Sequence, residues 1–455
     1  MTSPYGPLLR GRPVAVAGAG VSGSAAARVL RDLGALVTVV DGSAERLESL
    51  AAEGFSVSAA LPAELSLVVT SPGWRPDSPQ LVEAFARGVE VIGEVELAWR
   101  LRRPGAAPWL ALTGTNGKTT TVTMLESVLR AAGHRTVAAG NVGLPILDAV
   151  LAAEPYDVLA VELSSFQLHW SPGVRPHTGA ILNLADDHTD WHGSFQEYAL
   201  AKGRILDAGT AVGNADDEVV RTLLSRARGL RVTFTLNVPR PGEIGVVEDL
   251  LVDRAFADVP GEATELANLD DIPMDGLHNV ANALAAATMA RSFGVPAEAV
   301  RDGLRSYAPQ PHRNALVAVV DEVAWVDDSK ATNPHAAAAS LAAYDPVVWV
   351  AGGLLKGADV DDLVRRAAGR LRAAVLLGTD RAVIKDALAR HALDVPVVEV
   401  ERLDTGAMEE VVTAARALAR PGDTVLLAPA AASMDCFRDY KERGDLFATA
   451  VRALR

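Results

Sequence analysis

Cysteine is almost absent from this sequence, and long apolar runs are absent altogether. The single thiol, Cys436, excludes an internal disulfide and a cysteine-rich metal site, which suits a reducing compartment. No apolar run reaches the ~18 residues needed to span a bilayer, and the N-terminus lacks the continuous apolar stretch of a signal peptide. We therefore expect a soluble, cytoplasmic protein without membrane insertion.

Positive charge is also scarce. The 43 lysines and arginines are outnumbered by 57 aspartates and glutamates, and the net charge is −14. This balance disfavours a surface for polyanions, so we expect no nucleic-acid partner, although a local cationic pocket could still hold a nucleotide. Apolar residues, by contrast, make up 49% of the chain, so its 455 residues can bury several cores.

Short apolar runs alternate with helical patterns in three successive stretches of the chain. This alternation predicts βαβ units with parallel sheets. Only residues 232–271 differ, since they read as a strand-rich excursion before a clear helix at 278–294. A Pro-Gly cluster at 102–108 and the proline-containing segment "SYAPQPHR" at 306–313 indicate boundaries between the stretches.

The first stretch carries the glycine-rich turn "GAGVSG". Gly18, Gly20 and Gly23 follow an apolar run and open a helix, and Asp41 ends the next strand, where a ribose-reading acid stands in a dinucleotide fold. Backbone amides at such a helix start can receive a phosphate. The pattern alone fits a nucleotide-type ligand, a nicotinamide cofactor or a plain strand-to-helix turn without a ligand.

The second stretch carries "GTNGKTT" at 114–120. The usual phosphate loop has a glycine six residues before its lysine, but Leu112 occupies that position. The glycines let the backbone curl around phosphate oxygens, Lys118 can reach the terminal phosphates, and Thr119 or Thr120 can offer a hydroxyl to Mg²⁺. The irregular spacing leaves a chance glycine turn as the alternative.

Two polar residues follow neighbouring strands of the same stretch. Glu162 and His188 come just after apolar runs, where side chains can converge beside the loop, and Glu162 suits Mg²⁺ better than His188 does. The plain alternatives are a helix cap or surface pair for Glu162 and a hydrogen-bonded structural histidine for His188. Cys436 is expected to be a packed small residue.

The fold class predicted from these patterns is α/β with three domains. Residues 1–103 are predicted to form a Rossmann-like parallel sheet, 104–308 a central P-loop ATPase-like domain, and 309–455 a C-terminal Rossmann-like domain.

Ten ordered motifs resemble the Mur ligases of peptidoglycan synthesis. They are "GTNGKTT", "GNVGLP", "ELSSFQL", "DDHTDWH", "YALAK", "GLHNVANALAA", "PHR", "DDSKATNP", "AASMDCFRDYKERG" and "RGDLF". The resemblance runs from the first glycine turn to Phe447, and it is strongest to the member that joins D-glutamate to UDP-N-acetylmuramoyl-L-alanine. It implies an ATP- and Mg²⁺-dependent, ADP-forming acid–amino-acid ligase with these two substrates, and we expect a monomer.

The resemblance also implies that residues 1–103 bind the nucleotide sugar, 104–308 bind ATP and 309–455 bind the amino acid, and it implies a set of site residues. Those expected to bind ATP are Gly114, Thr115, Asn116, Gly117, Lys118, Thr119, Thr120, Asn279, Asn282, Arg313 and Asp328. Those expected to bind the nucleotide sugar are Gly20, Ser22, Gly23, Asp41, Ser71, Gly73, Asn141 and His188. Those expected in the amino-acid domain's share of the site are Lys330, Thr332, Lys356, Ser433 and Tyr440. Metal contacts are expected from Thr119, Glu162, His188 and a carboxylated Lys202, and catalytic roles from Lys118, His188 and Lys202.

Three of these residues have plain alternative readings. Without the resemblance, Lys202 reads as a solvated surface lysine, Lys356 as a partner of a carbonyl at a sheet end, and Ser433 as the cap of a following helix. A related ligase with another acceptor, such as a folylpolyglutamate synthetase, and a non-enzymatic or NAD-dependent nucleotide-binding protein remain the rival functions.

Overall fold

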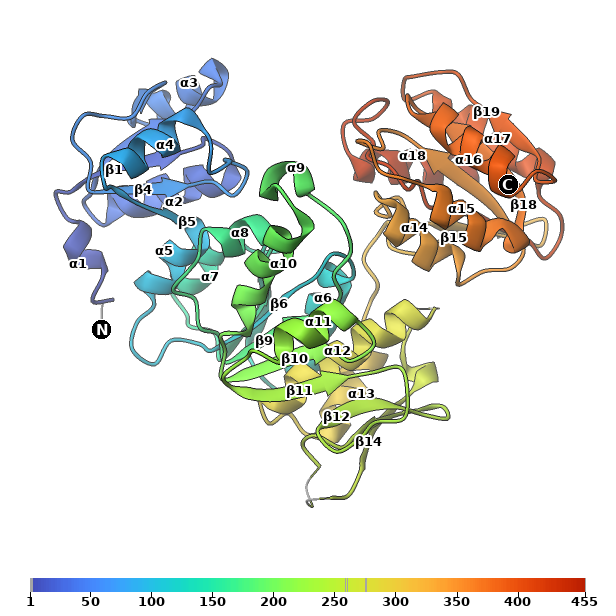
Figure 1. Cartoon of the computed structure of the whole chain (residues 1–455), viewed down its shortest axis with the longest axis horizontal. Coiled ribbons are helices and arrows are strands. Elements are labelled where there is room, and N and C mark those ends of the chain that lie inside the picture. Colours follow the sequence, from blue (N-terminus) through green and yellow to red (C-terminus); the bar gives the residue numbers. More distant parts are fainter. Residues whose placement is uncertain (1–2, 258, 260, 275, 455) are drawn as a thin grey trace. The chain divides into compact units, whose positions relative to one another are not determined.

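The computed structural model describes residues 3–257, 259, 261–274 and 276–454. Its strands form three sheets, each built from one continuous part of the sequence (Figure 1). By their internal contacts, the residues fall into two compact units, Met1–Ile272 with Ala281–Tyr307 and Pro273–Val280 with Ala308–Arg455. The predicted α/β class is confirmed, whereas the boundaries at 103/104 and 308/309 stay predictions.

The first sheet has five parallel strands in the order β3-β2-β1-β4-β5. Its elements are α1 Gly6–Leu9, β1 Pro13–Ala17, α2 Val21–Asp32, β2 Leu36–Val40, α3 Ala44–Ala52, β3 Ser56–Ser58, β4 Leu67–Thr70, α4 Pro79–Ala86, β5 Glu90–Gly93 and α5 Glu94–Leu101. Alternate residues of β1 enter two different apolar clusters, Val14 and Val16 one of them and Ala15 and Ala17 the other. Both faces of this sheet are therefore covered, as parallel sheets require.

The middle sheet has nine strands in the order β14-β13-β12-β11-β10-β9-β6-β8-β7. Its first elements are β6 Trp109–Thr113, α6 Lys118–Ala131, β7 Thr136–Gly140, α7 Ile146–Val150, β8 Val158–Glu162, α8 Ser165–His169, β9 Thr178–Ile181, α9 Thr189–His192, α10 Phe195–Gly203, the 3₁₀ helix η1 Arg204–Leu206 and β10 Thr210–Asn214. The remaining ones are α11 Glu218–Leu224, β11 Leu230–Phe234, β12 Glu243–Val247, β13 Leu250–Asp253, β14 Thr264–Asn268, the 3₁₀ helix η2 Leu269–Asp271, α12 Leu277–Ser292 and α13 Ala297–Arg305. β12, β13 and β14 pair antiparallel, so the predicted strand-rich excursion is confirmed.

The third sheet has six strands in the order β15-β16-β20-β17-β18-β19, and all but the β15–β16 hairpin pair in parallel. Its elements are β15 Ala315–Val320, β16 Val323–Asp327, α14 Pro334–Leu341, β17 Val347–Gly352, α15 Asp361–Ala367, the 3₁₀ helix η3 Ala368–Arg370, β18 Leu371–Leu377, α16 Arg381–His391, β19 Val397–Glu399, α17 Ala407–Leu418, β20 Thr424–Leu427 and α18 Tyr440–Arg452. Across the described part of the chain, no helix combines the length and the apolar character needed to cross a membrane.

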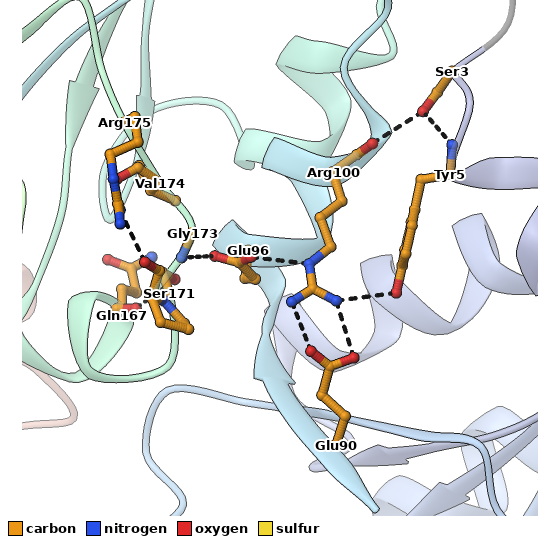
Figure 2. Close-up of polar contacts among 11 residues, drawn as sticks. Ser3, Tyr5, Glu90, Glu96, Arg100, Gln167, Ser171, Gly173, Val174 and Arg175 are labelled. Carbon is orange, nitrogen blue, oxygen red and sulfur yellow. Dashed lines mark hydrogen bonds and ion pairs between the residues drawn. The ribbon is translucent and has the colours of Figure 1, made fainter. Parts of the chain in front are cut away.

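A polar cluster fastens α5 to the loop that follows α8 (Figure 2). Glu96 is 2% exposed, and its carboxylate accepts from Arg100 Nε at 2.9 Å and from the backbone N–H of Gly173 at 2.8 Å. Arg100 also pairs with Glu90 on β5, at 2.8 and 3.0 Å. An ionised carboxylate is costly to bury without a partner, so these contacts hold α5 in one position.

We expect Arg100→Ala to lower the free energy of unfolding by about 3 kcal/mol, because it leaves the Glu96 carboxylate buried without its cation. Urea denaturation followed by tryptophan fluorescence measures this loss. Arg365→Ala on α15 is the control, since its pair with Asp362 is exposed on both sides and should contribute less than about 1 kcal/mol. Equal stability of the two variants would contradict the assigned role of Arg100.

Candidate active site

The loop at 114–117 follows β6, which lies between β8 and β9 in the middle sheet. α6 begins at Lys118 immediately after the loop. Gly117 has a φ of 79°, and a Cβ there would lie 2.3 Å from Asn282 Oδ1, so only glycine fits. Asn282, from α12, thus lies against the loop, and it also accepts from the Thr121 hydroxyl at 3.2 Å.

Two lysines converge on the carbonyl of Gly114. Lys118 Nζ donates to it and to the Thr115 carbonyl, each at 2.8 Å, and Lys202 Nζ donates to it at 2.8 Å. Lys202 also donates to the Thr113 hydroxyl at 3.1 Å and is only 2% exposed, so the reading of a solvated surface lysine is wrong. Burial lowers the pKa of the Lys202 amine well below its ordinary value, and the charge of Lys118 adds to this effect.

Glu162 ends β8 beside the loop. Its carboxylate accepts from the Thr119 hydroxyl at 2.8 Å and from Asn141 Nδ2 at 2.7 Å, and the residue is 1% exposed. The alternatives of a helix cap and a surface pair are therefore wrong. A carboxylate beside a hydroxyl matches the oxygen ligands that Mg²⁺ prefers, with water and phosphate completing its shell. Thr120, on the next position of α6, is buried.

His188 precedes α9 with a left-handed backbone, at φ 53°. Its ring lies 4.8 Å from that of Phe166 on α8 and 6.4 Å from that of Tyr198 on α10. Burial lowers the pKa of His188, the charge of Asp187 opposes this shift, and the charges of Lys202 and Lys118 add to it. Within the described residues, no group of three histidine, cysteine or carboxylate side chains is placed to hold a metal.

Two residues that sequence reasoning did not single out fix the loop. Asn183, just past β9, accepts from the backbone N–H of Asn116 at 2.9 Å and donates to its carbonyl at 3.1 Å. The Tyr198 hydroxyl lies 2.9 Å from that of Thr115, which also accepts from the N–H of Ala185 at 3.0 Å. Asn183 could have been noticed as a polar residue directly after an apolar strand.

The glycine turn of the first sheet lies where β1 meets β4 and the strand order reverses. This is the edge at which open α/β sheets bind ligands. Asp41 accepts from the backbone N–H groups of Ala19, at 2.6 Å, and of Ser43, at 2.8 Å, so its carboxylate shapes the turn. Gly20 and Ser22 open α2, Gly23 is buried within it, and Ser71 and Gly73 follow the neighbouring β4.

In the third sheet, three adjacent strands bring the predicted residues to one edge. β16 leads to Asp328, Lys330 and Thr332, β20 leads to Ser433, and β17 leads to Lys356, in the spatial order β16-β20-β17. Leu354 and Ala432 exchange two backbone hydrogen bonds, of 2.8 and 2.9 Å, which join the last two loops.

Contacts within this edge link the individual residues. Lys330 Nζ lies 4.1 Å from the centre of the Tyr440 ring. Burial raises the pKa of Asp328 to about 6, and the charge of Arg313 opposes this shift. Ser433 is buried but caps no helix, because α18 begins at Tyr440 and Asp439 is its cap, so that alternative reading is wrong. Asn279 belongs to the same compact unit as the third sheet and is buried.

Comparisons with known proteins agree with this arrangement. The Mur ligase middle domain matches residues 112–290, and the Mur ligase glutamate ligase domain matches 312–431. The C-terminal domain of alanine dehydrogenase/PNT matches residues 9–71, which include the first glycine turn. The chain belongs to the Mur ligase family.

Two relatives of high identity carry one and the same name. UDP-N-acetylmuramoylalanine–D-glutamate ligase of Thermobifida fusca (strain YX) is 61% identical over 462 residues, covering 98% of this chain and 99% of the relative. The protein of the same name from Streptomyces avermitilis is 58% identical over 461 residues, with 98% and 99% covered.

Solved structures show the same fold at low identity. UDP-N-acetylmuramate–alanine ligase from Thermotoga maritima has a TM-score of 0.59 at 20% identity, covering 98% of this chain and all of that one. MurF from Acinetobacter baumannii has a TM-score of 0.63 at 19% identity, covering 92% and 91%. At these identities the likeness concerns the fold alone.

Proposed function

We propose that the protein is an ATP-dependent ligase that adds D-glutamate to UDP-N-acetylmuramoyl-L-alanine in peptidoglycan precursor synthesis, in the cytoplasm. The observation that carries the proposal is the convergence of Lys118, Lys202 and the Thr119–Glu162 pair at the loop after β6. Relatives that carry the corresponding name at 61% and 58% identity support the choice of substrates.

The reaction must activate a carboxylate, which is a poor acylating agent. Its oxygen attacks the γ-phosphorus of ATP, the bond to the β–γ bridging oxygen breaks, and an acyl phosphate and ADP result. The amine of D-glutamate then attacks the acyl carbon, loses a proton, and phosphate leaves from the tetrahedral intermediate.

The site residues that lie beside the middle sheet have separate roles in this scheme. Lys118 would neutralise charge on the transferring phosphoryl group, because a preplaced cation stabilises the charge that develops there. Thr119 and Glu162 would hold a Mg²⁺ ion, which supplies further neutralisation of the phosphate oxygens when bound. His188 and Asn141 would contact the muramoyl substrate, and Asn282 would meet the nucleotide beside Gly117.

ADP release is the direct test of this proposal. We expect sustained ADP release only when both UDP-N-acetylmuramoyl-L-alanine and D-glutamate are present with ATP, because the acyl phosphate needs the muramoyl carboxylate in line and turns over only when the amine of D-glutamate attacks it. A coupled assay that omits each component in turn measures this. ADP release without the nucleotide sugar would contradict the proposal, and tight NAD binding at "GAGVSG" without ADP release would favour the NAD-dependent alternative.

The amino-acid domain is expected to select an anionic acceptor. Lys356 is exposed in the loop after β17 and would pair with a glutamate carboxylate, while Thr332, Ser433 and Tyr440 would add hydroxyl groups. Diaminopimelate or lysine would bring a like charge to Lys356. L-Glutamate would anchor the same carboxylates but swing its amine away from the acyl carbon, and a misplacement of about 1 Å can cost a hundred-fold in rate.

We expect Lys356→Ala to raise the KM for D-glutamate by about ten-fold and to leave the KM for ATP nearly unchanged, because an ionic hydrogen bond contributes roughly 1.5–3 kcal/mol. Steady-state kinetics with each substrate varied in turn measures both constants. Lys441→Ala serves as control, since Lys441 is exposed on α18 and has no proposed role. Equal changes in the two KM values would mean that Lys356 serves the nucleotide or domain closure instead.

A further inference from the structure

Glu94 is a buried carboxyl that the reaction scheme does not use. It is the first residue of α5, directly after β5, on the edge of the first sheet that also carries the glycine turn. The residue is 4% exposed, and its Oε1 has no hydrogen-bond partner. An orphaned carboxylate oxygen at such depth requires an explanation, because an ionised, unpaired carboxylate is costly to bury.

The first turns of three helices meet at this carboxyl. Ser22 in the first turn of α2 approaches it with its hydroxyl, and Leu147 in the first turn of α7 approaches it with its backbone N–H. The cluster at Glu96 and Arg100 fixes α5 (Figure 2), so the backbone of Glu94 is held beside these neighbours. Glu94 therefore connects the glycine turn with the element that follows the "GNVGLP" loop.

The surroundings of Glu94 raise the pKa of its carboxyl. Burial raises the pKa of its carboxyl to about 7, Ser22 and Leu147 lower it, and the charge of Asp148 on α7 raises it again. Arg28 on α2 is paired with Glu53, and Glu96 on α5 is paired with Arg100. Asp148 is thus the charged residue that acts on Glu94 from the packed helices.

We propose that Glu94 is a positioning residue for the diphosphate of the nucleotide sugar, and that its neutral form frees the Ser22 hydroxyl to donate to a phosphate oxygen. When Glu94 is ionised, it can only accept, so the Ser22 O–H is directed to it. When Glu94 is protonated, it donates to Ser22 Oγ instead, and the Ser22 proton turns toward the ligand. This inference rests on the proposed function, because it takes the glycine turn as the site of the uridine diphosphate group.

The proposal predicts proton uptake on binding. Wild-type protein should bind UDP-N-acetylmuramoyl-L-alanine at least about three-fold more tightly at pH 6 than at pH 8, since the ligand favours the protonated form. The diphosphate is a diester and does not titrate in this range. Calorimetry in two buffers of different ionisation enthalpy gives the number of protons taken up near pH 7, without any substitution.

Glu94→Gln is the matched variant, because an amide has the shape of the protonated acid and can donate to Ser22 in the same way. We expect it to bind at both pH values as wild type does at pH 6, with the proton uptake reduced by the share of Glu94, while the KM for ATP stays unchanged. Any proton that His188 takes up on binding is taken up by wild type and by Glu94→Gln alike, so it does not affect the difference between the two proteins. Glu48→Gln, an exposed acid on α3, should retain the wild-type pH dependence.

Two outcomes would overturn the proposal. The first is that the active wild-type ligase binds the nucleotide sugar equally tightly at both pH values and takes up no proton. This result would not affect the proposed function. The second is a Glu94→Gln variant with the same pH dependence as wild type. Failure of wild-type protein to bind the nucleotide sugar at any pH would instead reject the proposed function together with this inference.

Discussion

Lys118→Ala is expected to lower turnover by about a hundred-fold or more, because it removes the cation that would clamp the terminal phosphates of ATP. The Lys118 amine lies at the start of α6 and already points back over the loop, to the Gly114 and Thr115 carbonyls. Alanine at this position keeps the helix, since alanine is the strongest helix former.

Turnover should be measured as ADP release at saturating concentrations of all three substrates. Lys385→Ala is the matched control, because Lys385 is half-exposed on α16, pairs with Glu399 and has no proposed role. We expect this control to keep wild-type turnover. A Lys118→Ala protein as active as the control would show that the loop after β6 is not the ATP site.

The loop itself was predictable because its chemistry is local. Glycines at 114 and 117, a following lysine and hydroxyls, a strand before and a helix after are all visible in the sequence, and the structure has them in that order. The alternation of strands and helices also predicts a parallel sheet, in which polar residues after the strands gather at one edge. Glu162 could therefore be expected beside the loop although it lies 43 residues from Thr119, whereas the pairing of β6 with β8 and β9 rather than with β7 is seen only in the structure.

Burial of individual polar residues was harder to foresee. Lys202 has the sequence context of a surface lysine, and only the packing of α10 against the middle sheet buries it. Asn183 and Tyr198 fix the loop through contacts that depend on where β9 and α10 end. Such contacts are tertiary, and no local periodicity encodes them.

The burial of Glu94 beside the first sheet was equally hard to predict from the sequence. In the sequence it is one acid of a helix start, where a carboxylate is ordinarily exposed and favoured by the helix dipole. Its burial depends on α2 and α7, which come from residues more than 40 positions away on either side. The sequence could predict the turn that Glu94 borders but not the missing partner of its Oε1.

Lys202→Ala is expected to be nearly inactive, and short carboxylates such as acetate are expected to restore part of the activity. The reason is the proposed carbamate, in which the neutral amine adds to carbon dioxide, the Nζ–C bond forms and a proton is lost to solvent. Burial and the charge of Lys118 favour the neutral amine that this addition needs. The product is an anion in place of a cation, so a group that repels Mg²⁺ becomes one that can orient it.

The contacts of Lys202 also suggest an alternative role. As an unmodified ammonium it would hold the loop, because its Nζ donates to the Gly114 carbonyl and to the Thr113 hydroxyl. The two roles differ in which small molecule restores Lys202→Ala. Acetate replaces a carbamate, whereas methylamine replaces an ammonium group. Carbon-13 NMR of wild-type protein in labelled bicarbonate should also show a carbamate signal that Lys202→Ala lacks and Lys385→Ala keeps. Rescue by methylamine alone, or full activity of Lys202→Ala without any addition, would assign Lys202 to holding the loop rather than to the metal.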